Sequence, residues 1–330
     1  MIRNDDPGRS TPMHAAAPDV VLSLNGLQKS YGDLVAVKDL SLDVYRGEVF
    51  GFLGPNGAGK TTTIKMICGL LKSDAGEILI NNHSLKDHYR ECKRKLGLCP
   101  ENLVIWESLT CLEQLEFIGQ QYDLSRDAAK KKALELLDTL GLIEKRDKLA
   151  KELSSGMKRR LNIALALVHD PEILILDEPQ AGLDPQSRIM VREYIRSLSK
   201  RITVILTTHD MDEVDKLADR VGIIDNGQML VLDTPEGLKS RIGAGDILEI
   251  KIAADQDDAL ENLKVVLPKS LRDFTYQDET IRLVNIDTLG VLPVLLEAFQ
   301  HANMEILDIT IRKKTLEDVF IDLTGRRLRE

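Results

Sequence analysis

Two stretches decide the fold of this chain: Gly54-Pro-Asn-Gly-Ala-Gly-Lys-Thr61 and Ile173-Leu-Ile-Leu-Asp-Glu-Pro179. The first matches the phosphate-cradling pattern G-x-x-x-x-G-K-S/T at every position. An apolar, strand-like stretch (48–53) precedes it and a helical pattern (61–71) follows it, which is the context that the motif requires. The second stretch is an apolar run that ends in two acids, as expected for a buried strand of a parallel sheet that presents charge only at its tip.

The first stretch is equipped to hold a nucleoside triphosphate. Its glycines let backbone amides face a pyrophosphate, and the following helix directs its positive end at the same anion. Lys60 can reach the β and γ phosphates, and the Thr61 hydroxyl can coordinate magnesium. The predicted phosphate-binding residues are Gly54, Pro55, Asn56, Gly57, Ala58, Gly59, Lys60, Thr61 and Thr62.

The two acids of the second stretch are expected to have separate roles, because adjacent strand residues point to opposite faces. Asp177 is predicted to face the metal. Glu178 is predicted to be the general base that polarises water for in-line attack. Pro179 is expected to end the strand.

Composition narrows the class of protein. The chain has 330 residues, which is long enough for one large domain and a smaller one. A formal net charge of -9 argues against nucleic acid as a partner. We expect neither a bilayer-spanning run nor a secretion signal, and the four cysteines lack the C-x-x-C spacing of a disulfide or zinc scaffold. These features indicate a protein of a reducing compartment.

The order of predicted elements divides the chain into three parts. Residues 1–19 are polar and are expected to form a disordered tail. Residues 20–240 alternate strands with helices, which predicts an α/β domain with a mainly parallel sheet. Residues 241–330 begin with the strand–helix–strand–strand–helix–strand order of a small α+β, ferredoxin-like domain. A final helix follows, with Leu316, Val319, Phe320 and Leu323 on one face and Gly325 as its stop.

Further short motifs, in a fixed order, resemble those of the ATP-binding subunits of ABC transporters over about residues 20–232. Leu153-Ser-Ser-Gly-Met157 resembles the signature motif, Ala181-Gly-Leu-Asp184 the D-loop and Thr207-Thr-His209 the switch histidine. Pro100-Glu101 falls where the family places its Q-loop, and Tyr31 falls where it stacks an aromatic ring on adenine. The resemblance implies a P-loop ABC-type ATPase with ATP and Mg²⁺ as ligands.

By this resemblance, the predicted site residues fall into groups. The catalytic residues are Glu178, His209 and Lys60, and the metal-side residues are Thr61, Glu101 and Asp177. In the family, the signature motif contacts ATP bound by the opposite subunit. The resemblance therefore implies that Ser154, Ser155, Gly156 and Asp184 complete the site of a second ATPase subunit, with a homodimer expected and a heterodimer left open.

The sequence departs from the family pattern at three positions. Ser155 replaces a signature glycine, and its small side chain is tolerable at a helix start. Met157 replaces a glutamine, and export-type members of the resembled family often carry methionine there. Glu101 replaces the Q-loop glutamine, which is the more consequential change. A carboxylate should hold magnesium more strongly than an amide. We therefore expect Glu101 to make the dependence of ATPase activity on magnesium steeper without abolishing turnover.

Three features have competing interpretations. A lone histidine at a helix start is usually structural, but His209 follows a strand that borders the phosphate site, which favours a γ-phosphate sensor. Trp106 is either a packed core aromatic or part of a groove that receives the coupling helix of a membrane partner. The basic run Lys158-Arg-Arg160 is interpreted as a solvated helix face.

Two functions from different classes fit these motifs. The first is the ATPase subunit that powers a separate transmembrane permease, resembling the ABC-2-type exporter group, and located on the cytoplasmic face of the cell membrane. The alternative is a soluble ABC ATPase acting on ribosomes or DNA. Members of that class carry long coiled-coil or zinc insertions or two ATPase domains, and this chain has one glycine loop and one signature. A regulator with little turnover is disfavoured because it would not need Glu178.

Overall fold

The computed structural model describes residues 19–199, 201–242, 245–253, 257–268, 271, 274–285 and 288–325. The tail expected over residues 1–19 lies outside this range, except for Asp19. None of the helices within it combines the length and the apolar character needed to cross a membrane.

A six-stranded sheet forms the centre of the larger part of the molecule, with strand order β10-β9-β3-β8-β7-β6. All neighbouring strands run parallel except β9 and β10, so the predicted mainly parallel sheet is confirmed. The β9–β10 turn has positive φ at Asn226 and Gly227, as expected for a two-residue hairpin turn between antiparallel strands. The strands are β3 (Val49–Leu53), β6 (Leu96–Cys99), β7 (Ile173–Asp177), β8 (Thr203–Thr208), β9 (Arg220–Asp225) and β10 (Gln228–Asp233).

One face of this sheet is covered by a second, antiparallel sheet and by helix α1 (Lys60–Ile67). The helix was predicted to continue to residue 71, but it ends earlier because Gly69 adopts a left-handed conformation (φ 64°). The second sheet has the order β2-β1-β4-β5. Its strands are β1 (Val20–Tyr31), β2 (Leu34–Tyr45), β4 (Ala75–Ile80) and β5 (His83–Ser84).

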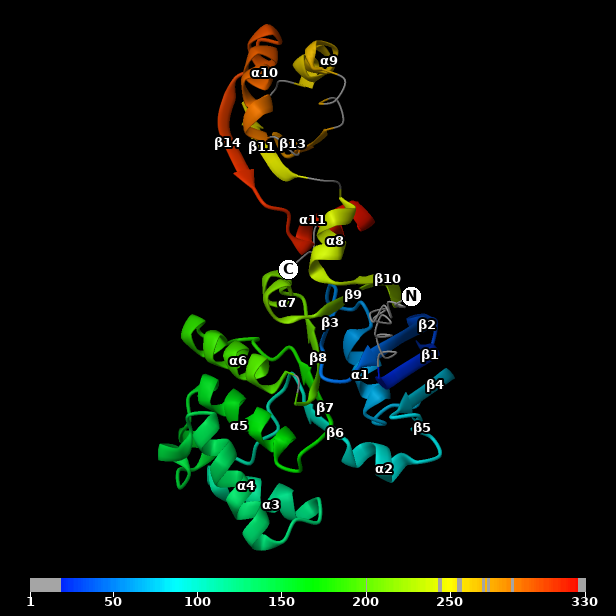
Figure 1. The fold of residues 1–330 in the computed structure, drawn as a ribbon, viewed down its shortest axis with the longest axis vertical. Helices are drawn as coiled ribbons and strands as arrows, with labels where there is room; N and C mark the ends of the chain where they lie inside the picture. Colours follow the sequence, from blue (N-terminus) through cyan, green and yellow to red (C-terminus); the bar gives the residue numbers. More distant parts are fainter. Residues whose placement is uncertain are drawn as a thin grey trace, which may run out of the picture.

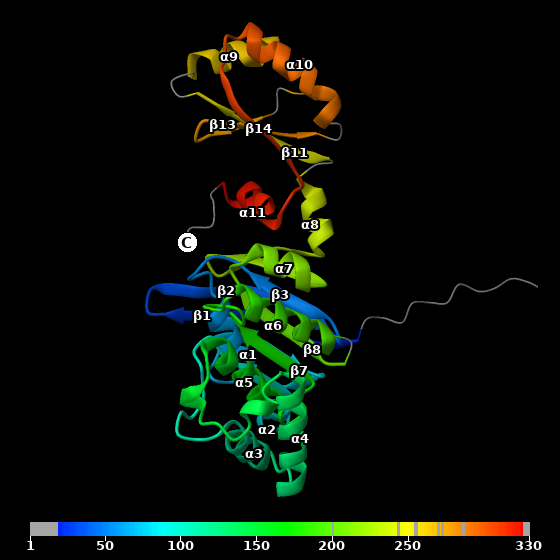
Figure 2. The same ribbon diagram turned by 90° about the vertical axis from the view of Figure 1, so that its left-hand side faces the viewer.

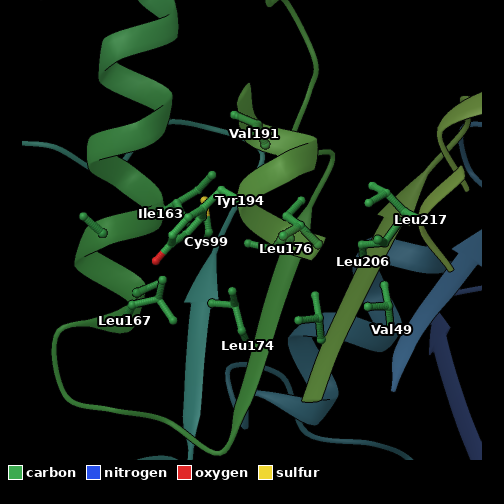
Figure 3. Close-up of a cluster of buried hydrophobic side chains, with 14 of the residues drawn as sticks. Val49, Cys99, Ile163, Leu167, Leu174, Leu176, Val191, Tyr194, Leu206 and Leu217 are labelled. Atoms are coloured by element: carbon green, nitrogen blue, oxygen red, sulfur yellow. The ribbon is translucent and has the colours of Figure 1, made fainter. Parts of the chain in front are cut away.

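The other face of the six-stranded sheet packs against helices. Side chains alternate along β7, so that Leu174 and Leu176 face these helices. Figure 3 shows Ile163 of α5 and Val191 of α6 packed over them. In Figure 1, helices α3 and α4 lie at the end of the molecule farthest from the C-terminal strands. The helices on this face are α3 (Cys111–Gln121), α4 (Arg126–Thr139), α5 (Ser155–Leu167), α6 (Pro185–Leu198) and α7 (Met211–Leu217), with short 3-10 turns at Ile143–Lys145 and Ala150–Glu152. Helix α2 (Tyr89–Arg94) instead buries Cys92 on the opposite face.

A separate four-stranded sheet with its own core follows helix α8 (Pro235–Arg241). Its order, β12-β13-β11-β14, and its antiparallel pairing are those of a ferredoxin-like sheet. Figures 1 and 2 show this C-terminal sandwich (residues 246–312) at one end of the molecule, with α8 and α11 between it and the larger part. Its elements are β11 (Asp246–Ile252), α9 (Asp257–Val266), β12 (Thr275–Gln277), β13 (Thr280–Asn285), α10 (Thr288–His301) and β14 (Ile306–Arg312).

The last helix, α11 (Leu316–Thr324), returns to the larger part of the molecule and packs against α7 and α8. Leu316, Val319 and Phe320 are buried in the same hydrophobic cluster as the helix-covered face of the six-stranded sheet. Gly325 ends the helix with φ 68°, as predicted. Leu323 was predicted on the same face as these residues but is 42% exposed, because the buried part of the helix ends at Phe320.

A cluster of four charged side chains joins the C-terminal sandwich to α11. Arg312 contacts Glu249 of β11 at 2.7 Å and Asp318 of α11 at 2.7 Å. Arg282 of β13 bridges the same two carboxylates, at 2.8 Å and 3.4 Å. Asp318 is almost fully buried and also caps α11 through Thr315. These ion pairs fix the position of the helix relative to the sandwich.

Candidate active site

The phosphate loop, residues 54–59, connects β3 to α1. A Cβ on Gly54 would strike the carbonyl oxygen of Ile224, and one on Gly59 would strike that of Ala36. Gly57 has open space around it and a φ of 82°, so only its backbone conformation requires glycine. Packing against neighbouring strands therefore requires glycine at two of these three positions. The sequence had suggested a different reason for the glycines, namely the close approach of a phosphate.

Lys60 lies inside this loop and is 6% exposed. Its Nζ donates hydrogen bonds to the carbonyl oxygens of Gly54 (2.6 Å) and Pro55 (3.2 Å). Burial lowers the pKa of Lys60, and the nearby carboxylates of Glu178, Asp177 and Glu101 oppose that shift. The ammonium group is thus held at the centre of the loop by carbonyl oxygens that phosphate oxygens can replace.

The two acids at the end of β7 take different conformations. Asp177 is the last residue of the strand, and its Oδ1 accepts a hydrogen bond from the hydroxyl of Thr207. Glu178 has φ 47°, a left-handed conformation that is uncommon for residues other than glycine. Its amide donates to the carbonyl oxygen of Thr207 (3.1 Å). Glu178 and Asp177 were predicted to point in opposite directions because side chains alternate along a strand. That reason is wrong, because the strand ends at Asp177 and Glu178 lies beyond it.

The left-handed turn directs the Glu178 carboxylate toward the side chains of Lys60 and His209. Its Oε1 lies 4.0 Å from Nζ of Lys60 and 3.0 Å from Nδ1 of His209. The three residues follow the carboxyl ends of the parallel strands β3, β7 and β8. This shared edge of the sheet, called the catalytic edge below, brings together the three residues predicted to be catalytic.

The predicted metal-side residues supply oxygen atoms only. Thr61 is half-buried at the start of α1, Asp177 is buried, and Glu101 is exposed just after β6. Among the residues that the structure describes, no group of three acidic, histidine or cysteine side chains could hold a metal ion by itself. The donor set fits Mg²⁺, which prefers oxygen ligands and takes much of its coordination from phosphate and water.

The signature and D-loop residues form a second, exposed group. Ser154 caps α5, where its Oγ accepts from the amide of Met157 (3.3 Å). Asp184 caps α6 by accepting from the amide (3.0 Å) and hydroxyl (2.7 Å) of Ser187. A Cβ on Gly156 would meet the Ser187 side chain, so the two helix starts are in contact. Ser155 is exposed beside them.

Tyr31 lies at the end of β1, where 49% of it is exposed. Nζ of Lys29 lies 5.9 Å from the centroid of its ring. An exposed ring beside a cation is available for stacking, and the adenine contact stays a prediction.

Trp106 lines a groove rather than the core. It is 40% exposed and makes an edge-to-face contact with Phe117 of α3, with ring centroids 5.6 Å apart. The groove has a cavity of about 290 Å³ and is lined mostly by apolar side chains from the sheet, α3 and α5. The interpretation of Trp106 as a packed core aromatic is therefore wrong.

The basic run at residues 158–160 is not a solvated face, contrary to the prediction. Lys158 pairs with Glu107 at 3.2 Å, but Arg159 and Arg160 are only 3% and 8% exposed. Both guanidinium groups donate to backbone carbonyl oxygens. The signal that was missed is the nearly unbroken apolar run from Leu161 to Leu167, which indicates a helix buried on all sides.

Comparisons with known proteins agree with this geometry. The ABC transporter family model matches residues 37–181. The linearmycin resistance ATP-binding protein LnrL of Bacillus subtilis is 38% identical and covers 94% of this chain, which spans 100% of that protein. The daunorubicin/doxorubicin resistance ATP-binding protein DrrA of Streptomyces peucetius is 35% identical, with 93% of each chain covered. The Nod factor export ATP-binding protein I of Ralstonia nicotianae is also 35% identical, over 94% of this chain and 95% of that one.

Solved structures show the same fold. The ATP-binding subunit of an ABC transporter matches with a TM-score of 0.62 and 30% identity, over 68% of this chain and 93% of that one. A dimeric post-hydrolysis state of the ATP-binding cassette MJ0796, bound to ADP and phosphate, matches with a TM-score of 0.59 and 27% identity, over 64% and 98%. The fold and site are those of a P-loop ATPase of the ABC type. The chain belongs to the ATP-binding subunits of ABC transporters, in the ABC-2-type exporter group, and it binds and hydrolyses ATP.

Proposed function

We propose that this chain hydrolyses Mg²⁺-ATP at the catalytic edge and uses the resulting dimer closure to drive a separate transmembrane permease, as an exporter. The observation that carries the proposal is the position of the Glu178 carboxylate, within 4.0 Å of Lys60 and 3.0 Å of His209. The relatives of this chain include resistance and export ATP-binding proteins, which supports export as the direction of transport.

Each residue of the catalytic edge has a proposed part in hydrolysis. Lys60 exchanges its carbonyl partners for β- and γ-phosphate oxygens. Glu178 accepts a proton as water attacks the γ-phosphorus and the bond to ADP breaks. His209 bonds the γ-phosphate and holds the glutamate in place. Thr61, Asp177 and Glu101 would hold Mg²⁺, which would neutralise charge on the phosphate oxygens.

A second copy of the chain completes each site in this proposal. Ser154 and Asp184 are exposed at two helix starts that touch each other. Helix N-termini bind anions, and the Ser154 hydroxyl can donate to phosphate while its oxygen still caps α5. A head-to-tail homodimer would place these groups on the ATP of the partner. The specific ATPase activity should then rise with protein concentration.

The permease is proposed to dock in the groove beside Trp106, which holds the chain on the inner face of the membrane. An apolar groove of this size, lined by Trp106, Tyr122 and Leu98, suits the apolar face of a short helix. Exposed Phe117 and Val104 extend the apolar surface at its rim.

The proposed role of the C-terminal sandwich is to strengthen subunit pairing. Deleting residues 246–330 would also remove α11 from the core of the larger part. Ile247 and Arg312 are paired neighbours in the sheet, so a short Gly-Ser linker can replace residues 246–311 and keep both α11 and the ion pair between Arg312 and Asp318. The excised variant should stay folded, and its two copies should dimerise more weakly in the presence of ATP. Unchanged dimerisation, measured by light scattering, would contradict this role.

The test uses Glu178→Gln, which should keep the ATP-bound state. The tagged variant is purified with Mg²⁺-ATP from detergent-solubilised cells, with a Lys60→Ala, Glu178→Gln variant as the matched control that cannot hold ATP. Recovery of a multi-spanning membrane protein with the first variant and not the second supports the permease. Recovery of ribosomes or DNA instead would support the alternative, a soluble ABC ATPase, and overturn the transport role.

A further inference from the structure

We infer that Arg159 is a positioning residue for ATP hydrolysis: its guanidinium fixes the backbone that aims Glu178 and joins the signature helix to the catalytic edge. This inference rests on the proposed role of Glu178 as the general base. Arg159 lies in the second turn of α5, the helix that Ser154 caps. The sequence predicted Arg159 on a solvated helix face, but the side chain is buried.

The guanidinium of Arg159 makes five hydrogen bonds, and a guanidinium has five N–H donors. All five acceptors are backbone carbonyl oxygens, at distances between 2.6 Å and 2.9 Å. Three belong to consecutive residues at the end of β7: Asp177 (2.7 Å), Glu178 (2.6 Å) and Pro179 (2.9 Å). The other two, Pro100 (2.7 Å) and Glu101 (2.9 Å), belong to the turn after β6.

The three carbonyls at β7 explain how Glu178 keeps an unfavourable conformation. A left-handed φ in a residue other than glycine persists only where the surroundings determine it. Here the amide of Glu178 is bonded to Thr207, and the carbonyls on both sides of the turn converge on one guanidinium. The direction of the Glu178 carboxylate is therefore set by Arg159 through the backbone.

The two carbonyls after β6 give the same side chain a second role. They belong to the turn that carries Glu101, a predicted magnesium-side residue. One side chain of α5 thus holds the backbone of Glu178 and the backbone of Glu101 at fixed positions relative to the helix that begins at Ser154. A movement of α5 must displace the base and the Glu101 turn together.

Arginine is the only side chain with enough donors for this arrangement. A lysine ammonium has three donors and a glutamine amide has two, so each would leave buried carbonyl oxygens unpaired. Activity at this position should therefore decrease in the order Arg, Lys, Gln. Arg160, the next residue in α5, is a matched control because its Nη1 donates to Leu140 (2.7 Å), away from the catalytic edge.

The experiment is a double-mutant cycle on the 330-residue chain, measured by single-turnover hydrolysis of Mg²⁺-ATP together with ATP affinity and melting temperature. Arg159→Gln should lower the hydrolysis rate by about 10- to 100-fold and leave ATP affinity within about 3-fold. Arg159→Lys should fall between the wild type and Arg159→Gln, and it replaces that variant in the cycle if Arg159→Gln does not fold. Arg160→Gln should lower the melting temperature with less than about 3-fold effect on the rate.

The decisive comparison is made in the Glu178→Gln background. If Arg159 acts through Glu178, adding Arg159→Gln to that variant should cost less than about 3-fold more. A full multiplicative loss there, or an equal loss of rate in Arg160→Gln, would overturn the inference. If Glu178→Gln alone left the rate unchanged, the proposed function would fail instead, so the two failures are distinguishable.

Discussion

Nδ1 of His209 lies 3.0 Å from Oε1 of Glu178, although the two residues are 31 positions apart in the sequence. They meet because β7 and β8 are parallel neighbours whose carboxyl ends share one edge of the sheet. His209 is 54% exposed, whereas the Glu178 side chain is only 11% exposed. The histidine is therefore placed between solvent and the buried carboxylate, where it can contact a γ-phosphate and restrain the base.

Glu101→Gln tests the carboxylate that stands in the Q-loop position. The amide should weaken magnesium engagement, so the Mg²⁺ concentration for half-maximal ATPase activity should rise by about 3- to 10-fold, while the maximal rate is retained. Titration of activity with Mg²⁺ at fixed ATP measures this. Glu107→Gln, which alters an exposed ion pair with Lys158, is the control. An unchanged magnesium dependence for Glu101→Gln would show that the carboxylate does not face the metal.

Trp106→Ala tests the groove as the docking surface. Loss of an exposed aromatic anchor at a docking site should weaken recovery of the membrane partner by about 10-fold or more, because such residues dominate interface energies. The ATPase activity of the chain alone should stay within about 2-fold, since Trp106 is outside the catalytic edge. Leu230→Ala, which removes an exposed apolar side chain on β10, serves as the comparison. Equal partner recovery by both variants would place the docking surface elsewhere.

Asp318→Asn tests the ion pairs between the C-terminal sandwich and α11. Burial alone would raise the pKa of Asp318, but hydrogen bonds from Arg312 and Thr315 lower it overall. A lowered folded-state pKa contributes stability that is present above the unfolded pKa, about 4, and is lost as the pH falls through the folded value. The variant should lose about 3 kcal/mol of unfolding free energy at pH 7.

The pH dependence of that loss is the informative part. Urea denaturation should show the difference between Asp318→Asn and the wild type shrinking as the pH falls from 7 toward 3, because the wild-type carboxylate then protonates. Glu261→Gln, at an exposed pair with Lys264, should change stability by less than about 0.5 kcal/mol at either pH. A loss at Asp318 that is independent of pH would indicate altered packing instead of a lost charge.

Sequence patterns predicted the parallel sheet, the ferredoxin-like strand order and the residues of the catalytic edge, because each depends on local periodicity and on a motif with fixed spacing. They failed where a neighbour distant in the sequence decides. The conformation of Glu178 depends on carbonyl contacts with Arg159, a residue 19 positions away. The same contact buries Arg159, although its immediate neighbours are charged.

The C-terminal end shows the same limit. The amphipathic pattern of α11 predicted a buried face, but not that this face would pack on α7 and α8 rather than on the sandwich that precedes it. That placement depends on contacts of Leu316, Val319 and Phe320 with residues that are distant in the sequence.

The hydrolysis rate of Glu178→Gln is the key measurement, since the proposed mechanism places the general base at the Glu178 carboxylate. Single-turnover hydrolysis of Mg²⁺-ATP should slow by about 100- to 1,000-fold, while ATP affinity stays within about 3-fold because Lys60 and the phosphate loop are unchanged. A rate within about 3-fold of the wild type, with ATP still bound, would contradict the assignment of Glu178 as the base and the mechanism built on it.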